Sequence, residues 1–284
     1  MKRNTPVVIF AFKKFVNLKM IFELVNDYNP PKVYIVIDQS KDVKTQQIQA
    51  RIEKLIAFFQ FSTSVDIIRP KSPQGIKQIF DFGLNRIFQE EEELIILEDD
   101  TIPSPLFFDY CDTMLKRFAL DDSIGCINGC NLETSMQKDA YFLSAIGLPF
   151  WGWATWKNRW QKITRDYAFW ETFRINEPVY KNEFLEEFSA IFDLFVKKDK
   201  SWDIRWTMFL LANKMKTVLP GANLVTNVGF THEATFTNIP NSSFSNLNMI
   251  QDTKESLNYE LELRMEEAYL SKIKLLINDV ARRK

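Results

Sequence analysis

Residues 74–100, "QGIKQIFDFGLNRIFQEEEELIILEDD", decide the fold, because they join a helix to a strand in one short stretch. Between Ile76 and Phe88 the apolar residues recur at i, i+3, i+4 and i+7, which predicts a helix with one apolar stripe. The aliphatic run 94–97 is typical of a strand that is covered on both faces. This run ends directly in three acids, which are Glu98, Asp99 and Asp100.

The residues before this stretch alternate between strand and helix patterns. Short apolar runs rich in β-branched residues occur at 6–12, 32–38 and 64–69, and helical spacing occurs at 18–28 and 45–60. Such alternation predicts an α/β fold with a mostly parallel central sheet and helices on both faces. Ligands of these sheets bind outside the carboxyl ends of the strands, where Asp38 and the three acids are expected to lie.

Composition excludes several classes of function. The chain has 284 residues, a net charge of −1 and a pI near 6.0, which argues against a general nucleic-acid binder. A single histidine excludes His-rich zinc chemistry. The three cysteines lack CxxC spacing, so reduced thiols in the cytoplasm are the simplest interpretation. The chain has no apolar run of the ~18 residues that span a bilayer, and Lys13 interrupts the only candidate signal peptide.

The three acids suit a divalent cation with oxygen ligands, such as Mn²⁺ or Mg²⁺, although a solvated strand end has the same pattern. Asp38 is either a turn-forming residue or a hydrogen-bond acceptor for a base or ribose. Arg69 stands beside a helix start, where it could meet phosphate oxygens. His232 could contact a metal or phosphate, or could simply be exposed.

Four tryptophans occur within ten residues of "WGWATWKNRW" (151–160), and core packing is one explanation for them. The other is that flat rings hold sugar rings, which makes Trp151, Gly152 and Trp153 candidate acceptor or sugar contacts. In "SWDIRW" (201–206), Asp203 is either a first-turn helix residue or a general base, since the neighbouring Trp202 and Trp206 would raise its pKa by desolvation.

These motifs, taken in order, resemble a known family. "IKQIFDFGLNRIF" before "ELIILEDDTIPSPLFFDY", followed by "GLPFWGWATW", "SWDIRW" and "NVGFTHEATF", is similar to nucleotide-sugar glycosyltransferases of the GT-A fold. The resemblance is to the branch related to N-acetylglucosaminyltransferase I and its bacterial relatives, and it spans residues 5–238. One departure lies at residues 235–237, which read Thr-Phe-Thr where bacterial relatives often have Thr-His-Thr. Another is that the loop around His232 carries no arginine.

The resemblance implies a role for each motif. Asp100 would bind Mn²⁺ (or Mg²⁺) that bridges the donor diphosphate, and Asp203 would be the catalytic base. The donor would also contact Asp38, Glu98, Asp99, Arg69 and His232. The donor sugar or the acceptor would lie near Trp151, Gly152, Trp153 and Trp202. Residues 1–240 would form the GT-A domain, with a nucleotide-sugar half (1–130), an acceptor half (131–240) and a C-terminal helical extension (241–284).

The expected function is metal-dependent transfer of a sugar from a nucleoside-diphosphate sugar, such as a UDP-sugar, to a glycan or lipid-linked acceptor, with inversion. We expect a cytoplasmic protein of bacterial polysaccharide biosynthesis, with weak peripheral membrane contact through the tail "ARRK" (281–284). Two other interpretations stay open, namely a non-catalytic sugar- or nucleotide-binding protein with a degenerate site and a metal-dependent phosphohydrolase. A sugar nucleotidyltransferase usually needs a Gly-rich loop after the first strand, and "FAFKKF" has no glycine.

Overall fold

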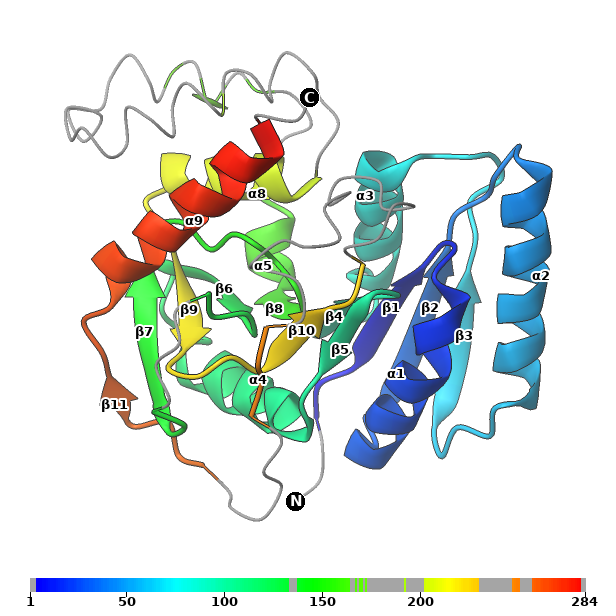
Figure 1. The fold of residues 1–284 in the computed structure, drawn as a ribbon, viewed down its shortest axis with the longest axis horizontal. Helices are drawn as coiled ribbons and strands as arrows, with labels where there is room; N and C mark the ends of the chain where they lie inside the picture. Colours follow the sequence, from blue (N-terminus) through cyan, green and yellow to red (C-terminus); the bar gives the residue numbers. More distant parts are fainter. Residues whose placement is uncertain are drawn as a thin grey trace.

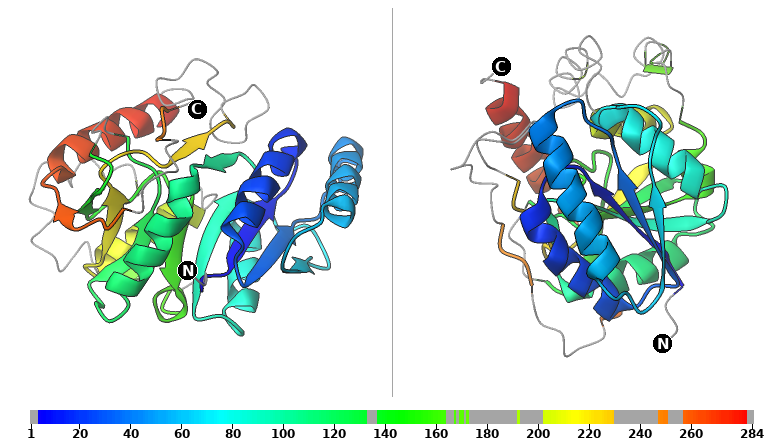
Figure 2. Two further views of the ribbon diagram at one scale, coloured as in Figure 1. Left: turned by 90° about the horizontal axis from the view of Figure 1, so that it is seen from below. Right: turned by 90° about the vertical axis from the view of Figure 1, so that its right-hand side faces the viewer.

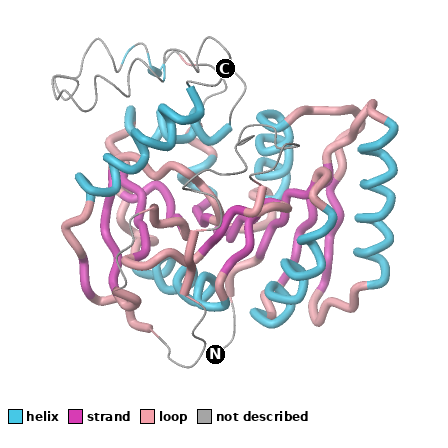
Figure 3. Tube along the Cα trace, in the orientation of Figure 1, coloured by secondary structure: helices cyan, strands magenta, loops and turns pink. Residues whose placement is uncertain are grey.

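The computed structural model describes residues 4–132, 137–163, 202–229, 247–250 and 257–281, together with residues 167, 169, 170, 172 and 192. Within this part of the chain, the strands form one nine-stranded sheet and a separate two-stranded ribbon. Helices pack on both faces of the large sheet (Figures 1 and 3). The predicted α/β fold with a mostly parallel central sheet is therefore confirmed.

The elements follow the chain in a strand–helix alternation. The large sheet contains β1 (Val7–Ala11), β2 (Lys32–Ile37), β3 (Ser64–Ile68), β4 (Glu93–Glu98), β6 (Ile124–Asn128), β7 (Ala140–Ser144), β8 (Trp153–Trp156), β9 (Lys216–Pro220) and β11 (Leu261–Glu262). The ribbon pairs β5 (Thr101–Pro103) with β10 (Val225–Asn227). The helices are α1 (Phe15–Tyr28), α2 (Val43–Phe58), α3 (Ile76–Ile87), α4 (Pro105–Arg117), α5 (Lys157–Trp160), α8 (Trp202–Ala212) and α9 (Glu266–Ala281).

The strand order of the sheet is β11-β7-β9-β6-β8-β4-β1-β2-β3. Strands β1, β2, β3, β4, β6 and β9 share one direction, whereas β7, β8 and β11 run oppositely. From β1 the chain adds β2 and β3 on one side and then returns to add β4 on the other. The order therefore reverses between β1 and β4, and such a reversal is where open α/β sheets bind ligands.

The apolar residues that predict helix α3 form the face that it buries. Its predicted stripe is buried against the sheet, with Ile79, Phe80, Leu84 and Ile87 almost inaccessible to solvent. Gly83 lies so close to the sheet that a Cβ atom there would be 2.9 Å from the Phe10 ring and 3.0 Å from Val36. Helix α1 adjoins both α2 and α4, and α3 adjoins α8 (Figure 2).

The C-terminal segment adds both a strand and a helix to the fold. Within the described residues, the predicted helical extension (241–284) is helical only in α9, which begins at Glu266. Leu261 instead belongs to β11, which pairs with β7, and its side chain is 46% exposed. Residues 257–265 are therefore not part of a helix. Residues 282–284 of the basic tail lie outside the described residues.

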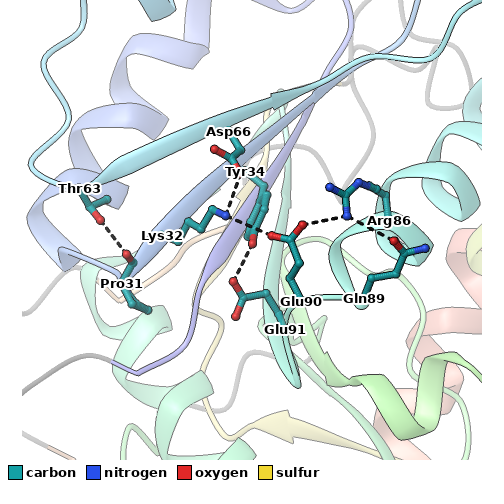
Figure 4. A network of polar contacts seen from close by, with 9 residues as sticks. All are labelled: Pro31, Lys32, Tyr34, Thr63, Asp66, Arg86, Gln89, Glu90 and Glu91. Atoms are coloured by element: carbon teal, nitrogen blue, oxygen red, sulfur yellow. Dashed lines mark hydrogen bonds and ion pairs between the residues drawn. The ribbon is translucent and has the colours of Figure 1, made fainter.

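A network of polar side chains connects β2 and β3, near their amino ends, with the residues between α3 and β4 (Figure 4). Lys32 Nζ lies 2.8 Å from Asp66 and 3.3 Å from Glu90, and Glu90 also pairs with Arg86 at 2.8 Å. The Tyr34 hydroxyl donates to Glu91 at 2.6 Å. The network joins the β3 edge to the loop before β4, at the opposite end of the strands from Glu98. No helix in the described part of the chain combines the length and apolar character needed to cross a membrane.

Candidate active site at the carboxyl ends of β1 and β4

Asp99 ties β4 to β1 at the point where the strand order reverses. Its Oδ2 accepts the backbone N–H groups of Phe12 at 2.8 Å, Lys13 at 3.0 Å and Lys14 at 2.9 Å. Lys14 is the N-cap of α1 and its own side chain makes no capping hydrogen bond. Asp99 thus orders the turn that leads from β1 into α1. Asp99 is 8% exposed, as expected for a structural anchor.

This contact changes what the start of α1 can bind. In Gly-rich nucleotide-binding folds, the N–H groups at the first strand–helix turn face the phosphates of the ligand. Here the same groups face Asp99 Oδ2. These three N–H groups are therefore already satisfied within the protein. A contact between Asp99 and ribose hydroxyls stays a prediction, with Oδ2 already engaged in the three hydrogen bonds.

Glu98 and Asp100 differ from Asp99, because neither carboxylate accepts a hydrogen bond from another described residue. Burial raises the pKa of Asp100 to about 7, and the charge of Asp99 adds to this effect. Burial also raises the pKa of Glu98 well above its usual value, helped by the charges of Asp100, Asp203 and Asp99 in that order. Clustered acids with raised pKa values favour a bound cation, which would stabilise their ionised forms.

The carboxylates present fit a cation that is shared with a substrate. Within the described residues, no three His, Cys, Asp or Glu side chains converge on one point as metal ligands. Mg²⁺-type sites nevertheless often use one or two carboxylates together with substrate phosphates and water. Asp100, at the end of β4, is positioned for such a site. Its role as metal ligand stays a prediction.

Asp203 reaches the same place from the opposite half of the chain. It occupies the first turn of α8, and its charge is close enough to Glu98 to raise the pKa of that residue. Asp203 Oδ1 accepts the Ile204 N–H at 2.9 Å. Two residues later, Arg205 forms a buried ion pair with Asp81 of α3, which holds α8 against α3. Asp203 thus lies within electrostatic reach of Glu98, although the two residues are far apart in the sequence.

A stack of aromatic rings includes Trp202, the residue that precedes Asp203. The Phe10 and Phe80 rings stack at 3.9 Å, Phe80 and Trp202 at 4.1 Å, and Trp202 and Trp153 at 5.2 Å. Both faces of Trp202 are therefore covered, and Trp153 is 1% exposed. Core packing accounts for these two rings. Their contact with a sugar stays a prediction, as does that of Trp151, which is 8% exposed.

Gly152 is required by its surroundings as well as by its backbone. Its φ is +68°, in the left-handed region that favours glycine. A Cβ atom here would be 2.8 Å from Val225, 3.2 Å from Phe107 and 3.4 Å from Leu97. Its carbonyl accepts the Gly129 N–H at 2.8 Å. These contacts place Gly152 next to Leu97, the residue before Glu98. Packing and backbone conformation therefore explain the glycine, independently of any contact with a sugar.

Sequence reasoning missed the residues that follow β10. Pairing of β10 with β5 brings the Val228 N–H to the Asp100 carbonyl at 2.9 Å. Asn227 Oδ1 accepts the Gly229 N–H at 2.7 Å. A Cβ atom on Gly229 would lie 2.1 Å from Asp100 Oδ2, so the carboxylate occupies the space of a side chain. The glycine in "NVG" was the only available signal. His232, three residues further on, lies outside the described residues.

Asp38 and Arg69 end β2 and β3 at the same edge of the sheet. Asp38 Oδ1 accepts the N–H groups of Gln39 at 2.8 Å and Gln74 at 2.9 Å, and Oδ2 accepts that of Gly75 at 2.8 Å. The carboxylate thus orders the loop before α3. Arg69 pairs with Glu53 of α2 and lines a groove of about 540 Å³ along β3. Contacts of Asp38 and Arg69 with a donor stay predictions.

No protein-family model and no curated protein matches the chain. Among solved structures, it is similar to the mannosyltransferase PcManGT from Pyrobaculum calidifontis in complex with GDP-Man and Mn²⁺, at a TM-score of 0.40 and 13% identity over 75% of this chain and 69% of that chain. It is also similar to a UDP-glucose pyrophosphorylase complexed with UDP-glucose, at a TM-score of 0.40 and 9% identity over 76% and 90% of the two chains. At these scores neither likeness bears on individual residues, and the strand order defines the fold.

Proposed function

We propose that the protein is a metal-dependent glycosyltransferase that moves a sugar from a nucleoside-diphosphate sugar to a hydroxyl of a glycan or lipid-linked acceptor. One observation carries the proposal. At the reversal of strand order between β1 and β4, Glu98 and Asp100 stand without hydrogen-bond donors from other described residues, and Asp203 from α8 lies within electrostatic reach of Glu98. A cation-binding acid and a potential base therefore share one edge of the sheet.

The donor would extend along the strand ends. Neighbouring strands are about 4.8 Å apart, so the ends of β4, β1, β2 and β3 span roughly 14 Å. The diphosphate would lie near Asp100, and the nucleoside would lie toward Asp38 and Arg69. When bound, Mn²⁺ would neutralise the charge that develops on the leaving diphosphate. We assign Asp100 as its protein ligand.

Asp203 is the base in this proposal. Its carboxylate would take the proton of the acceptor hydroxyl as the hydroxyl oxygen attacks the anomeric carbon. The bond from that carbon to the nucleoside diphosphate breaks in the same step, so the configuration inverts. A positioned general base contributes typically 10²- to 10⁴-fold to the rate. The Arg205–Asp81 pair and the covered faces of Trp202 hold the first turn of α8 in place for this role.

The engaged N–H groups at the start of α1 count against a nucleotidyltransferase. Such an enzyme binds a triphosphate at the turn after the first strand, and here Asp99 fills that place. A non-catalytic binder would not need a second carboxylate such as Asp203 opposite Glu98. The observed arrangement is better explained by transfer than by either of these functions.

Thermal unfolding with a panel of nucleotide sugars, with and without Mn²⁺, tests the proposal. We expect at least one nucleoside-diphosphate sugar to raise the melting temperature with Mn²⁺, and EDTA to remove the effect. Asp203→Asn should keep this donor response and lose transfer or donor hydrolysis, whereas Asp100→Ala should lose the response. Silence across the panel, or equal loss of donor binding in both variants, would reject the assignment.

A further inference from the structure

Asn227 is a buried polar residue at the end of β10, beside Asp100. Pairing of β10 with β5 sets Asn227 opposite Thr101, the residue that follows Asp100 (Figure 1). The next N–H group along β10, that of Val228, donates to the Asp100 carbonyl at 2.9 Å. Asn227 itself is only 5% exposed. The end of β10 therefore lies directly against the backbone of the predicted metal ligand, although the two strands are far apart in the sequence.

The side chains of Asn227 and Asp100 meet at Gly229. A Cβ atom on Gly229 would be 2.1 Å from Asp100 Oδ2 and 2.9 Å from Asn227 Oδ1, so the carboxylate and the amide share the space that this glycine leaves. The Gly229 N–H donates to Asn227 Oδ1 at 2.7 Å. This hydrogen bond fixes the orientation of the amide, because only its oxygen can accept an N–H group. The other amide atom, Nδ2, is then a donor of two hydrogen bonds.

Asn227 Nδ2 is an unused hydrogen-bond donor in a site that consists mainly of acceptors. It makes no hydrogen bond to any residue that the structure describes, whereas buried polar groups usually have a partner. When ionised, the side chains of Glu98, Asp100 and Asp203 offer only acceptor oxygens. The N–H groups at the start of α1 are engaged by Asp99. A phosphate in this site would need hydrogen-bond donors, and Asn227 supplies one beside Asp100.

From this arrangement we infer that Asn227 binds the nucleotide, with Nδ2 donating a hydrogen bond to an oxygen of the diphosphate held at Asp100. The inference rests on the proposed function, because it takes a nucleoside diphosphate as the ligand. A hydrogen bond to a charged phosphate oxygen is stronger than one between neutral groups. A neutral amide also suits this place better than a lysine, because a positive charge beside Asp100 would repel the cation.

Asn227→Asp separates this role from a structural one. The variant keeps an oxygen for the Gly229 N–H and nearly the same shape, but it replaces the N–H donor with an acceptor that repels phosphate. Calorimetry with UDP, GDP, ADP, CDP and TDP in Mn²⁺ identifies the nucleotide that binds, and we expect its affinity to fall at least ~10-fold in the variant. Mn²⁺ alone, followed by electron paramagnetic resonance, should bind no more weakly than to the unmodified protein. Asn227→Ala, which removes the N–H donor without adding charge, should also weaken nucleotide binding.

Asn213→Asp is the matched control, because it makes the same chemical change at an exposed asparagine just after α8. This control should bind the nucleotide like the unmodified protein. Unchanged nucleotide affinity in Asn227→Asp, or an equal loss in the control, would overturn the inference and leave the proposed function standing. A loss of Mn²⁺ affinity as large as that of nucleotide affinity would also overturn it, because Asn227 would then act through Asp100. If the unmodified protein binds none of these nucleotides with Mn²⁺, both the inference and the proposed function are rejected.

Discussion

Asp100→Asn should make the metal-free protein more stable at alkaline pH. The Asp100 carboxyl, which would ordinarily titrate near 3.8, titrates at a pKa of about 7 in the folded protein. Below pH 3.8 the carboxyl group is protonated in both the folded and the unfolded state, so it does not change the free energy of unfolding. Between about pH 4 and 7 the folded state binds the proton more tightly, so stability falls as pH rises. Above pH 7 the whole penalty remains, and the neutral amide of the variant avoids it.

The size of the effect follows from the same values. At 1.36 kcal/mol per pH unit, the interval from 3.8 to about 7 corresponds to at most ~4 kcal/mol. Asp100 is partly exposed, and solvent screening reduces this figure to about 1–2 kcal/mol. For a chain of this size, roughly 2 °C of melting temperature corresponds to each kcal/mol. We therefore expect Asp100→Asn to melt about 2–4 °C higher than the unmodified protein at pH 8.

The assay is thermal unfolding in EDTA at pH 4.5 and pH 8, followed by circular dichroism. The gain should be present at pH 8 and largely absent at pH 4.5. Asp139→Asn, at an exposed carboxylate, serves as the control and should change neither curve. If Asp100→Asn is no more stable than the unmodified protein at pH 8, or gains equally at both pH values, the pKa of Asp100 is not raised in the folded protein.

Three further predictions concern the same edge of the sheet. Asp99→Ala should destabilise the protein by roughly 3 kcal/mol in urea unfolding, because three backbone N–H groups lose their acceptor, and Asp99→Asn should recover part of this loss. Gly229→Ala should weaken Mn²⁺-dependent donor binding at least ~10-fold in calorimetry, because the methyl group displaces the Asp100 carboxylate; unchanged binding would contradict the contact. The rise in melting temperature caused by Mn²⁺ should be larger at pH 8 than at pH 6, because protons compete for Asp100; an equal rise would show that another group binds the metal.

The strands and helices could be predicted from the sequence because the apolar pattern of each element lies within one short stretch of residues. The stripe of α3 and the aliphatic run of β4 are buried as their spacing requires. The three acids at the end of β4 were visible for the same reason. The start of α9 was less predictable, because Leu261 pairs through its backbone in β11, and its side chain carries no sign of this.

The amino-acid sequence by itself determined the strand–helix alternation, the position of Glu98, Asp99 and Asp100 at a strand end, and the absence of a glycine in the turn after β1. Only the tertiary structure decided that Asp99 fills this turn, and that Asp203 and Gly229 come beside the acids. The physical reason is that these contacts depend on the order of strands in the sheet and on backbone N–H groups. Every residue type carries such a group except proline, so no local pattern reveals which of them will meet a carboxylate.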